Sequence, residues 1–297
     1  MQAKSLAPDD VVPDRREKFR GFMKRFNPTA PVRSAIEQGL IVEDDSRSLY
    51  KSLATRADLE PGSQQLLVGG IGSGKTTELT LAARWLVGQG KNLPLFIDVT
   101  EHTDLSKLNS GSLLASLGLR AYWRLMALAA KSKQPAAIGP DVKAAHARIK
   151  EFAYGKTEQV WVPDGDEMGP DFDEDDFSEP GHYRTIKTPG KLQPSFPPLD
   201  RDLEMALEPL LVLIDAIRAH NVDPVAIFDG LDRLMDARKF GLVAAQDLRA
   251  IRGLGVSVVV AAPLSLLYEQ GRQIADLFDR VHHLPAAMAD PQRDPFL

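Results

Sequence analysis

Apolar residues along this chain follow two spacings that divide it into short strands and longer helices. Apolar residues recur at helical spacing at Leu79, Ala82, Ala83 and Leu86, and again over residues 113–130, 141–152, 199–220 and 237–252. Near-continuous apolar runs, typical of strands covered on both faces, lie near residues 65–69, 93–99, 224–229, 256–262 and 281–284. Strands that alternate with helices predict a three-layer α/β/α sandwich around a mostly parallel sheet of about five strands.

One internal segment breaks this alternation. Residues 162–198 are rich in Pro, Gly and Asp and have no periodicity. Nine acidic residues and no Lys or Arg lie between Gln159 and Tyr183. We therefore predict an acidic, mobile insertion at about 160–198. The predicted organisation is a basic flexible arm over residues 1–30, one domain over 31–290 that carries this insertion, and a tail over 291–297.

The composition excludes several classes of function. The chain has 297 residues, of which 43% are hydrophobic and 26% charged, as in soluble globular proteins. It has no cysteine, which excludes disulfides, thiolate catalysis and cysteine-based metal sites. No apolar run approaches the roughly 20 residues that span a bilayer, and the N-terminus lacks an apolar signal core. We therefore expect no membrane span and a cytoplasmic location.

The charge distribution says little about partners. The net charge is −5, but the acidic insertion accounts for the negative sign, and the remainder is mildly basic. A solvated acidic loop does not exclude contact with nucleic acid elsewhere, and the slight basic excess does not indicate it.

A glycine-rich motif follows the first predicted strand and precedes a helix. It has the form Gly-x-x-x-x-Gly-Lys-Thr and comprises Gly69, Gly70, Ile71, Gly72, Ser73, Gly74, Lys75, Thr76 and Thr77. Strand, loop and helix in this order are typical of a phosphate-binding loop. A turn that binds nothing is the less favoured interpretation.

The residue types of this loop suit a polyphosphate. Backbone N–H groups can surround phosphate oxygens only where no Cβ obstructs them, which favours Gly69, Gly72 and Gly74. The N-terminus of the following helix adds free N–H groups and its positive dipole end. We expect Lys75 to reach the β- and γ-phosphates, Thr76 to bind Mg²⁺ and Thr77 to lie nearer the α-phosphate.

Two carboxylates follow the third predicted strand. The apolar run that begins at Pro224 ends at Asp229, and Asp232 lies three residues later. A buried parallel strand delivers its last residue to the carboxyl edge of the sheet, where ligands bind in open α/β folds. We therefore predict that Asp229 holds the magnesium carried by Thr76, and that Asp232 orients or deprotonates a hydrolytic water.

These two stretches together resemble a known family. Gly69 to Thr77, combined with Ile227-Phe228-Asp229-Gly230-Leu231-Asp232-Arg233, is similar to the STAND and AAA-like branch of P-loop NTPases. The Asp-Gly-Leu-Asp-Arg form resembles NACHT-type and especially KAP-type ATPases. The resemblance implies a sheet with the Lys75 strand central and a nucleotide-driven switch that works in oligomers. It also implies a place in bacterial signalling or antiviral defence.

The family resemblance also implies a helical lid after the last strand. Only a short tail follows that strand here, so we expect either a fragment of a longer protein, or a homo-oligomer or partner protein that supplies the lid or an arginine. Arg272 and Arg280 follow the fourth strand, in a region that faces the neighbouring nucleotide in AAA-like rings. We prefer Arg280 as a catalytic arginine in trans; its alternative role is a surface ion pair.

The leading functional hypothesis is a magnesium-dependent ATPase that acts as a nucleotide-driven conformational or assembly switch, with slow turnover. The alternative is a nucleotide-gated binding module that holds ATP or ADP with negligible hydrolysis. A small-molecule kinase ranks third, because no compact arginine-rich lid is evident. The chain lacks the Asn-Lys-x-Asp motif that reads guanine, so adenine is preferred by default.

Overall fold

The computed structural model describes residues 32–37, 49–101, 103–132, 138–163, 181–189, 203–234, 236–268 and 276–285. The chain divides into two units, residues 1–45 and 46–297. The boundary predicted near residue 30 lies outside the described residues. In the first unit the described part is helix α2 (Val32–Glu37).

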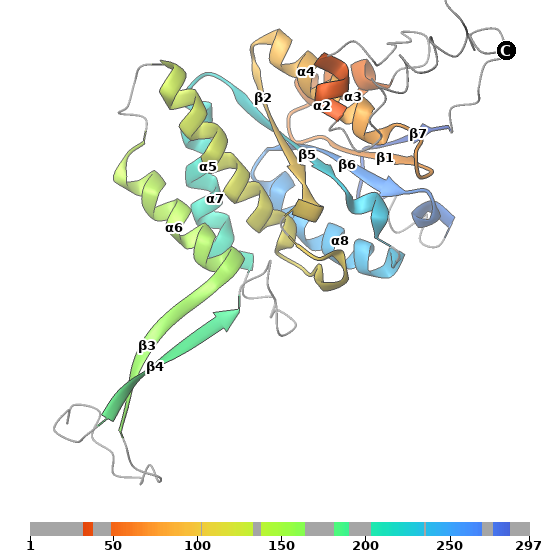
Figure 1. Cartoon of the computed structure of the whole chain (residues 1–297). Helices are drawn as coiled ribbons and strands as arrows, with labels where there is room; N and C mark the ends of the chain where they lie inside the picture. Colours follow the sequence, from red (N-terminus) through yellow and green to blue (C-terminus); the bar gives the residue numbers. More distant parts are fainter. Residues whose placement is uncertain are drawn as a thin grey trace, which may run out of the picture. The chain divides into compact units, whose positions relative to one another are not determined.

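The second unit is built on a five-stranded sheet in which every strand is parallel to its neighbours (Figure 1). All five predicted strands are present, and their bounds differ from the predicted ones by one residue at most. In spatial order they are β2 (Asn92–Asp98), β5 (Asp223–Asp229), β6 (Ser257–Pro263), β1 (Gln64–Gly69) and β7 (Arg280–Leu284).

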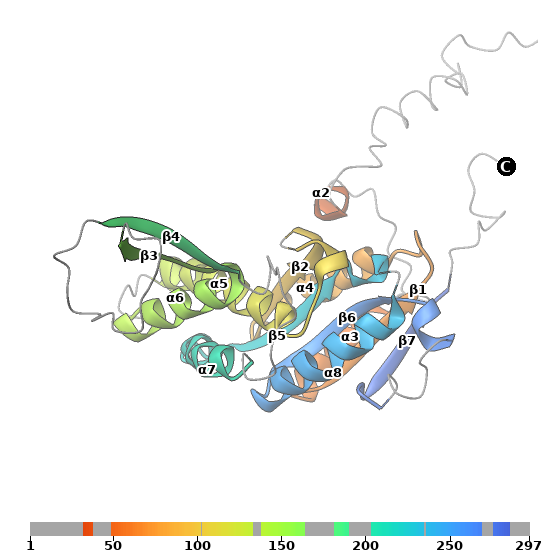
Figure 2. The same ribbon diagram turned by 90° about the horizontal axis from the view of Figure 1, so that it is seen from below.

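Helices cover both faces of this sheet (Figures 1 and 2), which confirms the predicted three-layer α/β/α sandwich. One face carries α3 (Tyr50–Leu59) and α4 (Lys75–Gln89). The other carries α5 (Ser112–Ser132), α7 (Glu204–Arg218) and α8 (Ala237–Gly253), and α6 (Pro140–Tyr154) packs on α5 and α7. Among the described residues, no helix combines the length and the apolar character needed to cross a membrane.

The strands are apolar throughout because both faces are buried. In β1, Leu66 and Val68 belong to the core that α5, α7 and α8 share with the sheet. Leu67 lies between them and therefore points to the other face, towards α3 and α4. All three side chains are fully buried, so β1 is fixed from both sides.

The order of the strands corrects one expectation. β6 is the central strand, and β1 lies between β6 and β7, one place from the edge. Two polar contacts anchor the start of β1: Gln65 Nε2 donates to the Leu53 carbonyl at 3.0 Å, and Gln65 Oε1 lies 3.1 Å from His282 Nε2. Buried polar groups need such partners. The two contacts of Gln65 therefore fix β1 against α3 and against β7.

A buried carboxylate joins α8 to the start of α5, on the same face of the sheet. Asp247 of α8 is fully buried and accepts hydrogen bonds from the backbone N–H groups of Gly111 and Leu113, at 2.6 and 2.8 Å. These groups lie at the start of α5, where N–H donors have no partner within the helix. Burial raises the pKa of Asp247 to about 6, although these hydrogen bonds favour the ionised form.

A two-stranded hairpin interrupts the chain between α6 and α7. β3 (Gly155–Pro163) continues directly from α6 and pairs antiparallel with β4 (Gly181–Pro189), with Trp161 opposite Tyr183. The sequence predicts no regular structure between residues 162 and 198, and this is wrong for β4. The rest of the acidic insertion lies outside the described residues.

Candidate functional site

The glycine-rich loop joins the carboxyl end of β1 to the start of α4. Gly72 and Gly74 have φ angles of +77° and +94°, in the left-handed region that glycine adopts without strain. At Gly69, an added Cβ would lie 2.5 Å from Ser73 Oγ and 2.9 Å from the Leu284 carbonyl oxygen. The glycines that the sequence selects are therefore required by the shape of the loop.

The loop leaves two features open to a ligand. Ile71 is 98% exposed, so it packs against nothing in the described part of the chain and does not fix the tip of the loop. The hydroxyl of Ser73 is buried and has no hydrogen-bond partner among the described residues. A buried hydroxyl without a partner is unfavourable, and a phosphate oxygen in the loop would satisfy it.

Lys75 bends back over this loop. Its side chain is 3% exposed, and Nζ donates to the carbonyls of Gly69 and Gly70, at 3.0 and 2.8 Å. Nζ also lies 3.0 Å from Asp232 Oδ2. These three acceptors use all three N–H donors of the ammonium group, so an incoming phosphate has to replace some of them.

Asp229 and Thr76, the residue after Lys75, are in hydrogen-bond contact. Asp229 is the last residue of β5, is 5% exposed, and accepts hydrogen bonds from the Thr76 side chain and the Gly230 N–H. The structure thus brings together the two residues predicted to bind magnesium. Asp232 stands in a 3-10 turn over Leu231–Arg233 that directly follows.

The electrostatics of Asp229 are those of a crowded carboxylate. Burial raises its pKa above the ordinary value, and the negative charges of Asp232 and Asp98 raise it further. The hydrogen bonds from Thr76 and Gly230 act in the opposite direction. A cation placed here would relieve this repulsion.

Asp98 is a site residue that sequence reasoning missed. It ends β2, and the register of the sheet places it beside Asp229. Its Oδ1 accepts hydrogen bonds from the N–H and the hydroxyl of Thr100, at 2.9 and 2.6 Å. The sequence does contain a signal for Asp98, because it ends an apolar strand, as Asp229 does. Parallel strands bring their carboxyl ends to one edge of the sheet, so both residues belong to that edge.

The described residues contain no group of three or more His, Cys, Asp or Glu side chains that could hold a metal by themselves. The Thr76 hydroxyl and the Asp229 carboxylate offer two oxygen ligands. Mg²⁺ commonly takes one or two protein ligands and completes its shell with phosphate oxygens and water. The site therefore fits magnesium that arrives with a nucleotide.

Glu78 is a second residue that the sequence did not reveal. It lies in the first turn of α4, and its Oε2 accepts hydrogen bonds from the N–H groups of Leu49 and Tyr50, at 2.8 and 2.7 Å. Burial raises the pKa of Glu78, while these two hydrogen bonds oppose the rise. Glu78 thus ties the start of α3 to the helix that carries Lys75.

Arg280 does not lie near the glycine-rich loop of its own chain. It begins β7 opposite Gln65, whereas Gly69 at the end of β1 lies opposite Leu284. Arg280 is exposed and stands at the amino edge of the sheet. Its predicted role in a neighbouring subunit stays a prediction, and Arg272 lies outside the described residues.

Comparison of the chain with protein-family models and with curated proteins finds no match.

Proposed function

We propose that this chain is a magnesium-dependent ATPase whose nucleotide cycle drives a conformational or assembly change. The observation that carries the proposal is the convergence of Lys75, Thr76, Asp229 and Asp232 on one glycine-rich loop. The resemblance to the STAND and AAA-like branch of P-loop NTPases rests on the same residues. A sheet in which one strand, β6, lies between β1, which leads into the glycine-rich loop, and β5, which ends at Asp229, is compatible with it.

Each residue has a distinct role in this proposal. Lys75 turns its ammonium group from the carbonyls of Gly69 and Gly70 to the β- and γ-phosphates. Thr76 and Asp229 hold the magnesium ion, which would neutralise charge that develops on the phosphate oxygens. The N–H groups at the start of α4 stabilise the same oxygens.

Asp232 orients the water that attacks the γ-phosphate. In the arrangement described here its carboxylate is paired with Lys75, at 3.0 Å. A phosphate that attracts Lys75 would release Asp232, so binding and activation of the water are linked. Binding of the γ-phosphate would therefore free the carboxylate that activates the attacking water.

The same ion pair supports the alternative proposal, a nucleotide-gated binding module with negligible hydrolysis. If Asp232 remains paired with Lys75 while nucleotide is bound, no carboxylate is free to activate water. The chain would then respond to ATP and ADP by binding alone. Turnover distinguishes the two proposals.

The test compares ATP binding and phosphate release in the parent chain and in Asp232→Asn. We expect the variant to bind ATP at least as tightly, because it loses the partner that competes for Lys75. Its turnover should fall by roughly 100-fold, as expected for loss of a positioned base. The control is Asp215→Asn, which removes an exposed carboxylate that pairs with Arg218 on α7.

Three results are informative. ATP binding without phosphate release by the parent chain would favour the binding module. Unchanged turnover in Asp232→Asn would remove Asp232 from the mechanism. Absence of ATP binding by the folded parent chain would reject the phosphate-loop assignment.

A further inference from the structure

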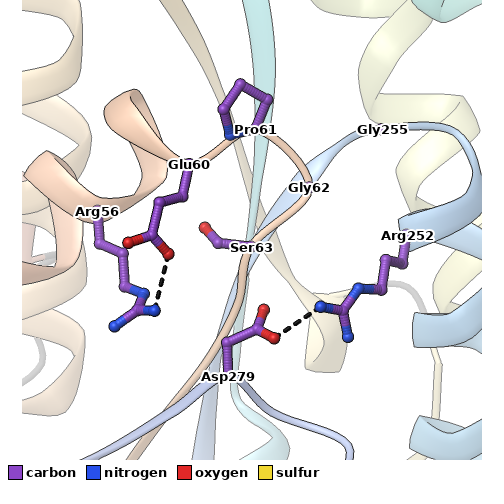
Figure 3. A pocket seen from close by; sticks show the side chains of 8 residues that line it. All are labelled: Arg56, Glu60, Pro61, Gly62, Ser63, Arg252, Gly255 and Asp279. Atoms are coloured by element: carbon purple, nitrogen blue, oxygen red, sulfur yellow. Dashed lines mark hydrogen bonds and ion pairs between the residues drawn. The ribbon is translucent and has the colours of Figure 1, made fainter.

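A second polar pocket lies at the amino edge of the sheet, at the end of β1 opposite the glycine-rich loop (Figure 3). Its walls come from the end of α3 and the turn into β1, from the end of α8, and from the residue before β7. The volume is about 380 Å³, within the range of small-molecule sites.

Two arginines are held in place around this pocket. Arg56 Nη2 lies 2.7 Å from Glu60 Oε2, and Arg252 Nη2 lies 2.6 Å from Asp279 Oδ1. The second oxygen of Asp279 accepts a hydrogen bond from the Gln64 N–H at 2.7 Å. Each guanidinium group therefore has a carboxylate partner in the pocket lining.

Two buried donors of residues that line the pocket lack partners among the described residues. Ser63 is 4% exposed, and its hydroxyl makes no hydrogen bond there. Figure 3 shows this hydroxyl directed into the space beside the Glu60 side chain. Arg56 Nε is also buried without a partner. Buried polar groups are normally hydrogen-bonded, so this pair of donors requires an acceptor.

The charges of the lining balance, because Arg56 and Arg252 face Glu60 and Asp279. The side chains of Glu60 and Asp279 are 53% and 26% exposed, so water can satisfy their remaining oxygen sites, whereas Ser63 Oγ and Arg56 Nε are buried donors without a partner among the described residues. Arg280, next to Asp279, adds an exposed positive charge outside the lining. The buried groups that lack a partner are thus donors, and a ligand that satisfies them must offer hydrogen-bond acceptors.

We propose that this pocket binds a small ligand through an oxyanion, a carboxylate or phosphate group that accepts hydrogen bonds from Ser63 and Arg56. Carboxylate and phosphate are the groups that guanidinium binds most strongly. The proposal does not depend on nucleotide binding at the other edge. It adds a separate ligand site. β1 runs from this site to the glycine-rich loop.

The test titrates the isotope-labelled chain with inorganic phosphate and, separately, with acetate, at constant ionic strength held with chloride. Nuclear magnetic resonance follows the backbone amides of Gly62, Ser63 and Gly255 and the Nε–H of Arg56. We expect saturable shifts at these groups with phosphate or acetate and none with chloride. The anion with the higher affinity identifies the preferred group.

Lys75→Ala separates the two sites, because it removes the cation of the glycine-rich loop. Shifts in the pocket should persist in this variant with unchanged affinity. Arg56→Gln should weaken binding in the pocket at least about tenfold, the loss expected for one charge-assisted hydrogen bond. Ser63→Ala should weaken it by a smaller factor, and the control Arg148→Gln, an exposed arginine paired with Glu208, should not change it.

Several results would overturn the proposal. Shifts that do not saturate, or that chloride reproduces, would show that the donors bind only water or unspecific ions. Equal affinity in the parent chain, Arg56→Gln and Ser63→Ala would remove the site. If Arg56→Gln fails to fold by circular dichroism, Ser63→Ala alone decides: unchanged affinity in that variant rejects the proposal.

Discussion

Each edge of the sheet carries an ion pair between a basic side chain and an aspartate, but the two pairs differ in burial. At the carboxyl edge, Lys75 and Asp232 form an ion pair whose lysine side chain is only 3% exposed. At the amino edge, Arg252 and Asp279 are 48% and 26% exposed. A buried pair lacks water to replace a lost partner, whereas an exposed pair is weak and easily replaced. Burial, rather than the number of charges, therefore marks the edge where a substitution has large consequences.

The largest effect is expected at the buried edge. Lys75→Ala removes the ammonium group that would contact the β- and γ-phosphates, so ATP affinity should fall by roughly 100-fold, while the fold survives. Isothermal titration calorimetry measures the ATP affinity. The control is Lys131→Ala, at the exposed end of α5. ATP affinity equal to that of the parent chain would contradict the assignment of the loop.

The second prediction connects the two edges in an assembly. If Arg280 at the amino edge of one subunit completes the glycine-rich loop of the next, Arg280→Ala and Lys75→Ala chains should each be inactive alone. Mixing them should restore about a quarter of the parent ATPase activity, since each supplies what the other lacks. Specific activity that is independent of concentration, with no rescue, would leave Arg280 as a surface residue.

The third prediction uses the opposite pKa shifts of the two edges. Burial and neighbouring carboxylates raise the pKa of Asp229. Partial burial also acts to raise the pKa of Asp279, but the hydrogen bonds from Gln64 and Arg252 outweigh it and lower the pKa. Ionised Asp229 therefore costs stability, and this cost disappears as pH falls through its raised pKa towards the ordinary aspartate value of 3.8. Ionised Asp279 contributes stability, which is lost as pH falls below 3.8 and through its lowered pKa.

Urea unfolding at pH 7 and at lower pH checks these signs. Asp229→Asn should be more stable than the parent chain at pH 7, and the difference should shrink as pH falls. Asp279→Asn should be less stable by about 1 kcal/mol at pH 7, as for loss of a typical hydrogen bond. The same sign of change in both variants would contradict the comparison of the edges.

The smallest effect is expected at an exposed pair away from both edges. Arg148 and Glu208 are 50% and 72% exposed and lie 3.0 Å apart. Arg148→Gln should therefore change the free energy of unfolding by less than about 1 kcal/mol and leave ATP affinity unchanged. A larger loss would mean that exposure is a poor guide to the effect of removing a charge in this protein.

Local patterns allowed much of the fold and most residues of the candidate site to be predicted. The five strands were predictable because each is a continuous apolar run, and Lys75, Thr76, Asp229 and Asp232 because their spacing is specific. The position of β6 between β1 and β5 was not, since strand order depends on pairings between distant segments. Asp98 enters the site only through this order and register.

Two further features were hidden for physical reasons. The Asp247 side chain caps α5 from 134 residues away at Leu113, and no local pattern announces a cap supplied by another helix. β3 begins directly where α6 ends, at Gly155, so the helical pattern and the acidic stretch obscured its alternating residues. Tertiary contacts, not propensity, decide these features.

The place of β1 between β6 and β7 also determines when the glycine-rich loop can form during folding. Both neighbours of this early strand come from the end of the described chain, because Gln65 pairs with Val259 and with Arg280. Closing loops of this length is slow, and a strand without neighbours exposes unpaired N–H and C=O groups. During synthesis β1 lacks its second neighbour until β7 has emerged, so the glycine-rich loop is among the last of the described elements to be completed.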